Sequence, residues 1–133
     1  MPIIPFSPLL YRDTRAVKII NQTKDTVLAK EVIIADTFLK RIKGLLGRKD
    51  FLPGEALIIK PCNSIHTFFM RFPIDVLFLD GRNRVVRALK DIPPFHLSGI
   101  YFSSHHAIEL PAGVIASTAT EEGDTLLLES LLE

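Results

Sequence analysis

Short segments in which apolar residues alternate with polar ones, or run without interruption, occupy most of this 133-residue chain. Segments of this kind, bounded by glycine, proline, asparagine or aspartate, predict β-strands. Two strands are expected in 16–36 around a polar turn at 21–25. Further strands are expected at "EALIIKP", "HTFFMRF", "IDVLFLD", "RVVRALK", "HAIELPAG" and "DTLLLESLL". The turn "DGRN" between the third and the fourth of these predicts a hairpin.

One segment, 37–48, has the periodicity of a helix. Asp36 or Thr37 is placed to cap it, and Gly47 with the following "LPG" to end it. Its apolar side chains fall within an arc of about 120° at 100° per residue, which predicts an amphipathic helix docked on the core. They are Phe38, Leu39, Ile42, Leu45 and Leu46. The fold class predicted from these elements is mainly β (α+β), with a small antiparallel, barrel-like sheet and this one helix packed on it.

Length and composition predict one soluble globular domain, since 47% of the residues are hydrophobic and 23% are charged. Proline-rich residues 1–16 are expected to form an extended arm, and 17–133 the domain. The formal net charge of +1 provides no global field for nucleic acid or membranes. No segment reaches the roughly 18 apolar residues of a membrane span, and no signal-peptide pattern is visible, so a cytoplasmic location is expected. The oligomeric state is not indicated.

Asp75 stands out because it lies inside an apolar strand. Alternation places it on one face with Leu77 and Leu79, while the opposite face is also apolar. A strand with two apolar faces is expected to be buried on both sides. The Asp75 carboxylate must then be paired or hydrogen-bonded, because an unpaired buried charge costs about 3–5 kcal/mol. It is either an acid of a functional site or a structural acid that binds backbone N–H groups or an arginine, and the residues alone favour the structural role.

The predicted helix carries a stripe of Arg41, Gly44 and Arg48 beside its apolar face. The two arginines are two turns apart and lie within about 20° of one another on the helical wheel. Glycine costs about 1 kcal/mol in a helix relative to alanine, which indicates a close approach by a ligand or another backbone. The arginines either bind an anion with their guanidinium groups or form ion pairs with Asp75 or Glu109.

His66 and its neighbours are candidates for catalysis. A triad of Ser64, His66 and Asp75 is disfavoured, because Ser64 and His66 would project in parallel about 7 Å apart and no G-x-S-x-G turn is present. Cys62 with His66 has the residue types of a thiol nucleophile, but the pairing is a common coincidence. Metal binding by Cys62 with His66, His96, His105 or His106 lacks any established ligand spacing, so neither a metal nor a cofactor is expected. Cys62 is the single cysteine, so it forms no disulfide within the chain.

Glu109 alternates with apolar residues in "HAIELPAG". It is either a second carboxylate close to Asp75 or an exposed glutamate of a strand. The strand pattern alone favours the exposed position.

Four segments together resemble a known family. "RIKGLLGR", "IHTFFMRFPIDVLFLDGRNRVVR", "IELPAG" and "EEGDTLLL" are similar, in this order, to the landmarks of the bacterial and archaeal family known as domain of unknown function 192. The resemblance covers about residues 27–128 and implies a small, mainly β domain with a packed helix, without implying a reaction. Its motif positions in this chain are Arg41, Gly44, Arg48, Ser64, His66, Met70, Pro73, Asp75, Glu109 and Gly113.

Three functions are compatible with these observations. The first is a module that binds a small molecule or a peptide in a polar, anion-accepting pocket, lined by Arg41, Gly44, Arg48, Ser64, His66, Asp75 and Glu109. The second is a hydrolase or transferase that uses His66 and Asp75 as base and orienting acid. The third is an assembly protein whose N-terminal arm adds to the sheet of a partner.

Overall fold

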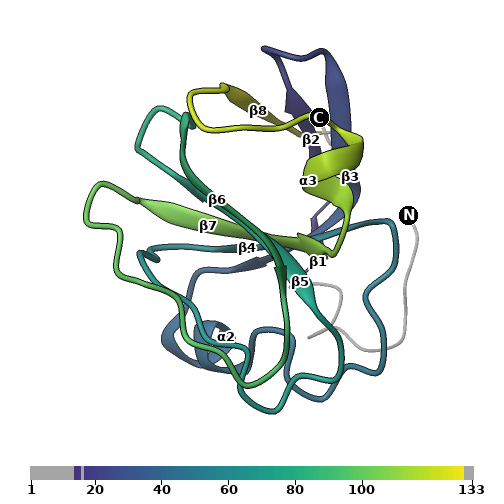
Figure 1. The fold of residues 1–133 in the computed structure, drawn as a ribbon, viewed down its shortest axis with the longest axis vertical. Coiled ribbons are helices and arrows are strands. Elements are labelled where there is room, and N and C mark those ends of the chain that lie inside the picture. Colours follow the sequence, from purple (N-terminus) through teal and green to yellow (C-terminus); the bar gives the residue numbers. More distant parts are fainter. Residues whose placement is uncertain (1–13, 16, 131–133) are drawn as a thin grey trace.

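The computed structural model describes residues 14–15 and 17–130, and its architecture is mainly β (Figure 1). Seven strands follow one another across a mixed sheet in the order β6-β5-β7-β4-β3-β2-β8, and β1 pairs with β3 beside them. The strands are β1 (Thr14–Arg15), β2 (Val17–Asn21), β3 (Thr26–Ala35), β4 (Gly54–Ile59), β5 (Ile74–Leu79), β6 (Val85–Ile92), β7 (His106–Pro111) and β8 (Leu126–Ser130). The helices are α2 (Phe38–Lys43) and α3 (Val114–Ser117). Among the expected strands, only "HTFFMRF" is wrong, as described below.

The sheet is mixed because β3 and β4 run parallel, whereas the other neighbours along the path are antiparallel. The path is open at β6 and β8, so the prediction of a purely antiparallel, barrel-like sheet is not confirmed. The two edges approach at one place, where Arg84 and Thr125 form an isolated bridge. The hairpin expected at "DGRN" is present, since the Asn83 amide donates to the Asp80 carbonyl at 3.0 Å.

The hydrophobic core consists of two clusters on opposite faces of the central strands. Leu77 and Leu79 of β5 belong to one cluster, and Ile74, Val76 and Phe78 to the other. All six residues of β5 are buried, as are all six of β7 beside it. The expectation of a strand buried on both sides is therefore confirmed for Ile74–Leu79.

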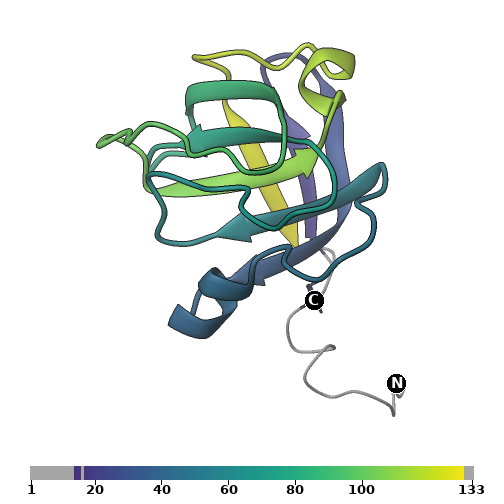
Figure 2. The ribbon, with the colours of Figure 1, turned by 60° about the horizontal axis from the view of Figure 1, so that its bottom comes forward.

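The helix differs from the prediction. Thr37 caps it as expected, its hydroxyl oxygen accepting from the Lys40 amide, but it ends after six residues because Gly44 has a φ of +46°. Past this turn Leu45 is buried, while Phe38 and Leu39 are 67% and 75% exposed and Ile42 is also exposed. Figure 2 shows α2 projecting from the end of the sheet. The prediction of an amphipathic helix docked on the core is thus not confirmed, because no residue of α2 is buried.

The segment 66–72 is a loop, although its alternation of residues predicted a strand. His66 makes one isolated bridge to Leu97, and Thr67 is buried with its hydroxyl bonded to the Pro93 carbonyl at 2.7 Å. Phe69 has a φ of +64°, a value that an extended strand does not allow. The aromatic run therefore forms a loop whose Phe68 and Phe69 side chains are exposed.

Of the arm expected at 1–16, the structure describes Thr14 and Arg15, which lie opposite Ile33 and Val32 of β3. Residues 1–13 and 16 lie outside the described residues. Neither helix within residues 17–130 has the length and hydropathy of a membrane span.

Candidate functional site

A hollow of about 250 Å³ lies between the end of α2, the loop that follows β4, and the middle of β7. It is lined by residues 41–46, 61–66, Ile59, Met70 and Glu109, and we refer to it as the Glu109 pocket. Five of the predicted binding residues line it together. They are Arg41, Gly44, Ser64, His66 and Glu109. The remaining two, Arg48 and Asp75, lie elsewhere.

Glu109 is the most unusual group of the pocket. Its side chain comes from the central strand β7, where Leu57 of β4 and Val76 of β5 are its register partners, and the residue is only 2% exposed. Its Oε1 atom is buried and has no hydrogen-bond partner among the described residues. Burial raises the pKa of the Glu109 carboxyl to about 8, so the neutral acid predominates at pH 7. The expectation that Glu109 is exposed is wrong, because β7 lies inside the sheet and the end of α2 and the loop 61–66 lie beside the side chain.

Cys62 and Arg41 complete the polar part of the Glu109 pocket. The Cys62 thiol donates to the Ser64 carbonyl at 3.1 Å, and burial raises its pKa to about 11, so the thiol is not an activated nucleophile. Glu109 and Arg41 line the same pocket as this thiol. Arg41 Nη1 donates to the Lys60 carbonyl at 3.3 Å, and no ion pair of Arg41 occurs among the described residues. A cationic donor and a neutral acid therefore line one small cavity.

His66 and Asp75 do not come together. The Nδ1 atom of His66 accepts from the Phe68 amide at 3.1 Å, and the residue is exposed at the edge of the Glu109 pocket. Asp75 belongs to the face of β5 that carries Leu77 and Leu79, and does not line this pocket. No hydrogen bond joins the two side chains within 17–130, so the geometry does not provide a base with its orienting acid.

Asp75 has a structural environment instead. It is 1% exposed, and its two oxygens accept from three backbone amides: Asp91 at 2.8 Å, Gly113 at 3.1 Å and Ile115 at 2.9 Å. The pairing of β5 with β6 shifts register between Ile74 and Val76, and the Asp75 carboxylate binds an amide at this irregularity. The expectation that Asp75 is buried and bonded to backbone N–H groups is confirmed.

Arg48 lies on the other side of Gly44, in a second hollow of about 420 Å³ between α2 and strands β3 and β4. Its Nη2 atom donates to both carboxylate oxygens of Glu55, at 3.0 and 3.1 Å, and its guanidinium lies 5.7 Å from the centre of the Phe51 ring. Because the helix ends at Gly44, the expected stripe of two adjacent arginines does not form. Arg48 is a structural partner of Glu55, while Arg41 faces the Glu109 pocket.

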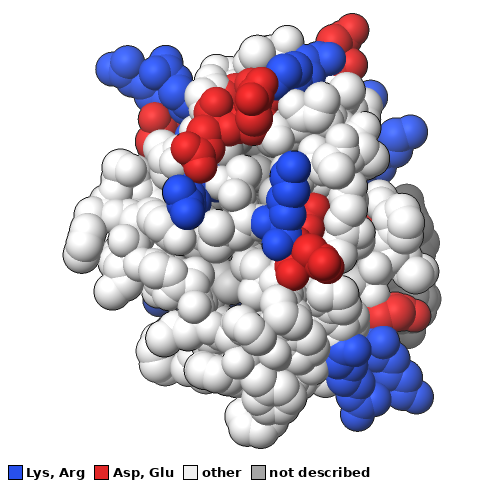
Figure 3. All heavy atoms as spheres, in the orientation of Figure 1, with Lys and Arg blue, Asp and Glu red and all other residues white. Residues whose placement is uncertain are grey.

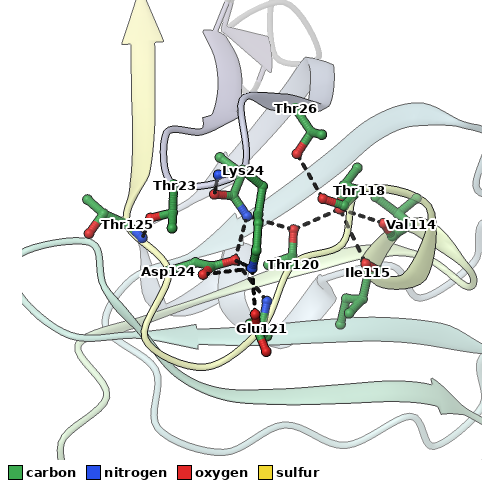
Figure 4. A network of polar contacts seen from close by, with 11 residues as sticks. Thr23, Lys24, Thr26, Val114, Ile115, Thr118, Thr120, Glu121, Asp124 and Thr125 are labelled. Carbon is green, nitrogen blue, oxygen red and sulfur yellow. Dashed lines mark hydrogen bonds and ion pairs between the residues drawn. The ribbon is translucent and has the colours of Figure 1, made fainter.

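A buried polar cluster that the sequence did not indicate joins the β2–β3 turn to the segment before β8 (Figure 4). At its centre Asp124 accepts from Asn21 at 2.9 Å, from Lys24 at 2.9 Å and from the Glu121 amide at 3.0 Å. Burial alone would raise the pKa of Asp124, but these hydrogen bonds hold it below its ordinary value. The partners are about a hundred residues apart, so no local spacing could have revealed them. Both oxygens of the Asp124 carboxylate are hydrogen-bonded, so this Asp124 cluster ties the β2–β3 turn to the segment before β8.

The surface carries charges of both signs. On the face shown in Figure 3, acidic and basic side chains lie close to one another over the upper half, while the lower half is uncharged except towards the right, where a basic and an acidic group lie together. The loop residues 61–70 contain no Lys, Arg, Asp or Glu. Within residues 14–15 and 17–130, no group of three or more His, Cys, Asp or Glu side chains is arranged to hold a metal ion.

The chain matches one family model over residues 19–128, that of DUF192, described as Uncharacterized ACR. The chain belongs to the DUF192 family. The resemblance noted in the sequence is thereby confirmed and extends slightly further towards the N-terminus. The UPF0127 protein TK1120 of Thermococcus kodakarensis is 38% identical to this DUF192 protein over 115 residues, which cover 81% of this chain and 71% of the relative. The UPF0127 protein PH1112 of Pyrococcus horikoshii is 38% identical over 114 residues, 81% of this chain and 96% of the relative.

Two crystal structures share the fold of this DUF192 protein. A protein of unknown function from Novosphingobium aromaticivorans superimposes with a TM-score of 0.76 over 95% of this chain and 91% of its own. A proposed transcription regulator from Sinorhizobium meliloti superimposes with a TM-score of 0.74 over 86% of this chain and 92% of its own. Each is 19% identical to the chain, so the similarity establishes the fold alone.

Proposed function

We propose that this DUF192 protein is a binding module that takes up a small molecule with an anionic group in the Glu109 pocket. The observation that carries the proposal is the combination of Arg41 with a buried, unpaired carboxyl in one cavity. A buried polar atom without a partner costs about 1–3 kcal/mol, and a ligand that hydrogen-bonds to it recovers part of this cost.

The size and charge of the cavity define the class of ligand. Its volume of about 250 Å³ lies below the roughly 300–1,000 Å³ of pockets for drug-sized molecules, so the ligand is small. Arg41 and Lys43 carry positive charge at the pocket, while its one acid, Glu109, is largely neutral at pH 7. This balance favours an anionic ligand over a cationic one. The partner is a small molecule; a peptide would engage the pocket only through one side chain or its terminal carboxylate.

A binding function needs no activated nucleophile or base, whereas a catalytic function does. A hydrolase or transferase would need an activated nucleophile or base, whereas the Cys62 thiol has a raised pKa and no acid of the described residues binds His66. Assembly through the N-terminal arm has no supporting observation among the described residues. The cytoplasmic location remains a prediction, which cell fractionation would test.

A site-specific NMR screen tests the proposal. The chain has two methionines, Met1 and Met70, and Met70 lines the Glu109 pocket, so ¹³C-methyl labelling gives one reporter inside it. Anionic, neutral and cationic fragments at millimolar concentration are added in turn, and a saturable shift of the Met70 signal by anionic fragments is expected. Arg41→Lys should weaken their binding about tenfold or more, because an ammonium group does not reproduce the guanidinium fork.

Arg48→Lys is the matched control, since Arg48 lies in the other hollow, paired with Glu55. It should leave the binding of anions unchanged. If no fragment of any charge shifts the Met70 signal saturably, the protein is not a binding module at this site.

A further inference from the structure

The buried acid Glu109 restricts the class of ligand that fits the Glu109 pocket more than the volume of the pocket does. Glu109 comes from a central strand, is almost completely buried, and leaves its Oε1 atom without a partner among the described residues. A buried side chain with an unused hydrogen-bonding atom at the wall of a cavity requires a complementary group from whatever fills that cavity. The protonation state of Glu109 decides whether this complementary group is a hydrogen-bond donor or an acceptor.

The groups that face Glu109 favour a neutral acid. Arg41 and Lys43 from the end of α2 and Cys62 and His66 from the loop after β4 are the other titratable side chains of the pocket. None of them forms an ion pair with Glu109 among the described residues, and burial is the cause of its raised pKa. A neutral carboxyl donates one hydrogen bond through its O–H group and accepts through its carbonyl oxygen.

The remaining lining combines apolar side chains with the neutral polar residues Asn63 and Ser64. Ile59, Ile65, Met70 and Leu45 line the cavity together with the polar groups, and the loop 61–66 beside them is uncharged. The hollow has a volume of about 250 Å³. A compact ligand with one charged end and a short hydrocarbon tail fits this combination.

From these contacts we propose that the Glu109 pocket binds a small organic monocarboxylate, with the protonated side chain of Glu109 donating a hydrogen bond to the ligand carboxylate. Arg41 balances the negative charge of the ligand, and the apolar walls hold its tail. This inference rests on the proposed function, and it adds the class of ligand and the proton on which binding depends.

A dependence on pH follows. An anion that binds only the protonated form of Glu109 loses affinity as this group ionises, and the pKa of about 8 sets the range. The protonated fraction of Glu109 falls from about ten-elevenths at pH 7 to about one-eleventh at pH 9. The apparent Kd of the anion should therefore rise about tenfold over this range. Cys62 remains a thiol throughout, because its pKa is about 11.

The test uses butyrate, butyramide and butylamine, three probes of similar size and different charge, with the Met70 methyl signal as reporter. Butyrate should bind more tightly than the other two at about pH 7 and lose about tenfold in affinity by about pH 9. Glu109→Gln keeps a donor at this place but does not titrate, so the variant should bind butyrate at both pH values with the same Kd. Glu122→Gln, the same change at a carboxyl that is 52% exposed and outside the pocket, should keep the tenfold ratio.

Several results would overturn the inference while leaving the binding function in place. They are butyrate affinity that does not change with pH in the parent, a ratio that persists in Glu109→Gln, or butylamine binding that exceeds butyrate and strengthens as pH rises. If Glu109→Gln does not fold, the pH ratio of the parent and the order of the three probes still decide. If none of the probes, nor any other fragment, shifts the Met70 signal, the proposed function fails together with the inference.

Discussion

Replacing Asp75 by asparagine should destabilise the fold, because the carboxylate binds three backbone amides at once. Its Oδ1 atom accepts from Asp91, and its Oδ2 atom accepts from Gly113 and Ile115. Asparagine has one carbonyl oxygen and one amide group. If the oxygen serves Gly113 and Ile115, the amide group points a donor at the donor of Asp91.

The magnitude follows from these contacts. A buried N–H group that loses its partner costs about 1–3 kcal/mol, and each bond to a charged acceptor is worth more than its neutral counterpart. We therefore expect Asp75→Asn to lower the free energy of unfolding by about 2–4 kcal/mol, and the Tm by roughly 10 °C for a domain of this size. Asp75→Ala leaves all three amides unpaired and should cost more.

Urea denaturation and thermal melting followed by far-UV circular dichroism measure the effect. Asp50→Asn is the matched control, since Asp50 is exposed and makes no hydrogen bond among the described residues. A urea midpoint and a Tm for Asp75→Asn equal to those of Asp50→Asn would refute the structural role of this acid. An Asp75→Ala variant no less stable than Asp75→Asn would refute the contribution of the three amide hydrogen bonds to stability.

Three further predictions concern the Asp124 cluster, the Cys62 thiol and the end of α2 at Gly44. Asp124→Asn should cost about 1–3 kcal/mol at pH 7, measured by urea denaturation, because Asn21 and Lys24 lose a charged acceptor. Since the folded-state pKa of Asp124 is lowered, this stabilisation is present above about pH 4 and is lost as pH falls through the lowered value, so the parent and the variant should converge in acid. Cys62 should react with iodoacetamide at pH 8 about 100-fold more slowly than in the urea-unfolded chain, because its pKa rises from 9.0 to about 11. Gly44→Ala should cost about 1–3 kcal/mol in the same assay, because φ is +46° there, whereas Gly81→Ala should cost little.

Each of these has a contrary outcome. A stability difference for Asp124→Asn that grows in acid would show that the lowered pKa is not the source of its contribution. Equal alkylation rates in the folded and the unfolded chain would contradict the burial of the Cys62 thiol. Equal urea midpoints for the two glycine variants would show that the helix end at Gly44 is not strained.

The sequence by itself determined most of the extended segments and the burial of Ile74–Leu79 on both faces. Asp75 is an example: the apolar residues on both sides of it required a buried strand, and a buried carboxylate required partners, because an unpaired charge is too costly there. The partners were beyond the sequence, since the three amides lie 16, 38 and 40 residues away along the chain. The folding of the chain brings these amides to Asp75, and the local pattern of apolar and polar residues carries no information about such distant contacts.

Other residues show where local reasoning is insufficient. A helical wheel over 37–48 assumes an unbroken helix, but the turn with positive φ at Gly44 sends Leu45 into the core and leaves Phe38 and Leu39 in solvent. The same turn separates Arg41 from Arg48. The alternation in "HTFFMRF" is equally compatible with the loop that forms, because Thr67 finds its partners in the segment 93–96.

Glu109 shows most clearly what tertiary structure decided. Its alternation with apolar neighbours is the same in an edge strand and in a central one. Only the tertiary structure places β7 between β4 and β5 and brings residues 41–46 and 61–66 beside the carboxyl. This packing removes water from the carboxyl, and the loss of water raises its pKa. A residue whose chemistry depends on desolvation can therefore be named from the sequence, but its charge at pH 7 is set by the elements that pack around it.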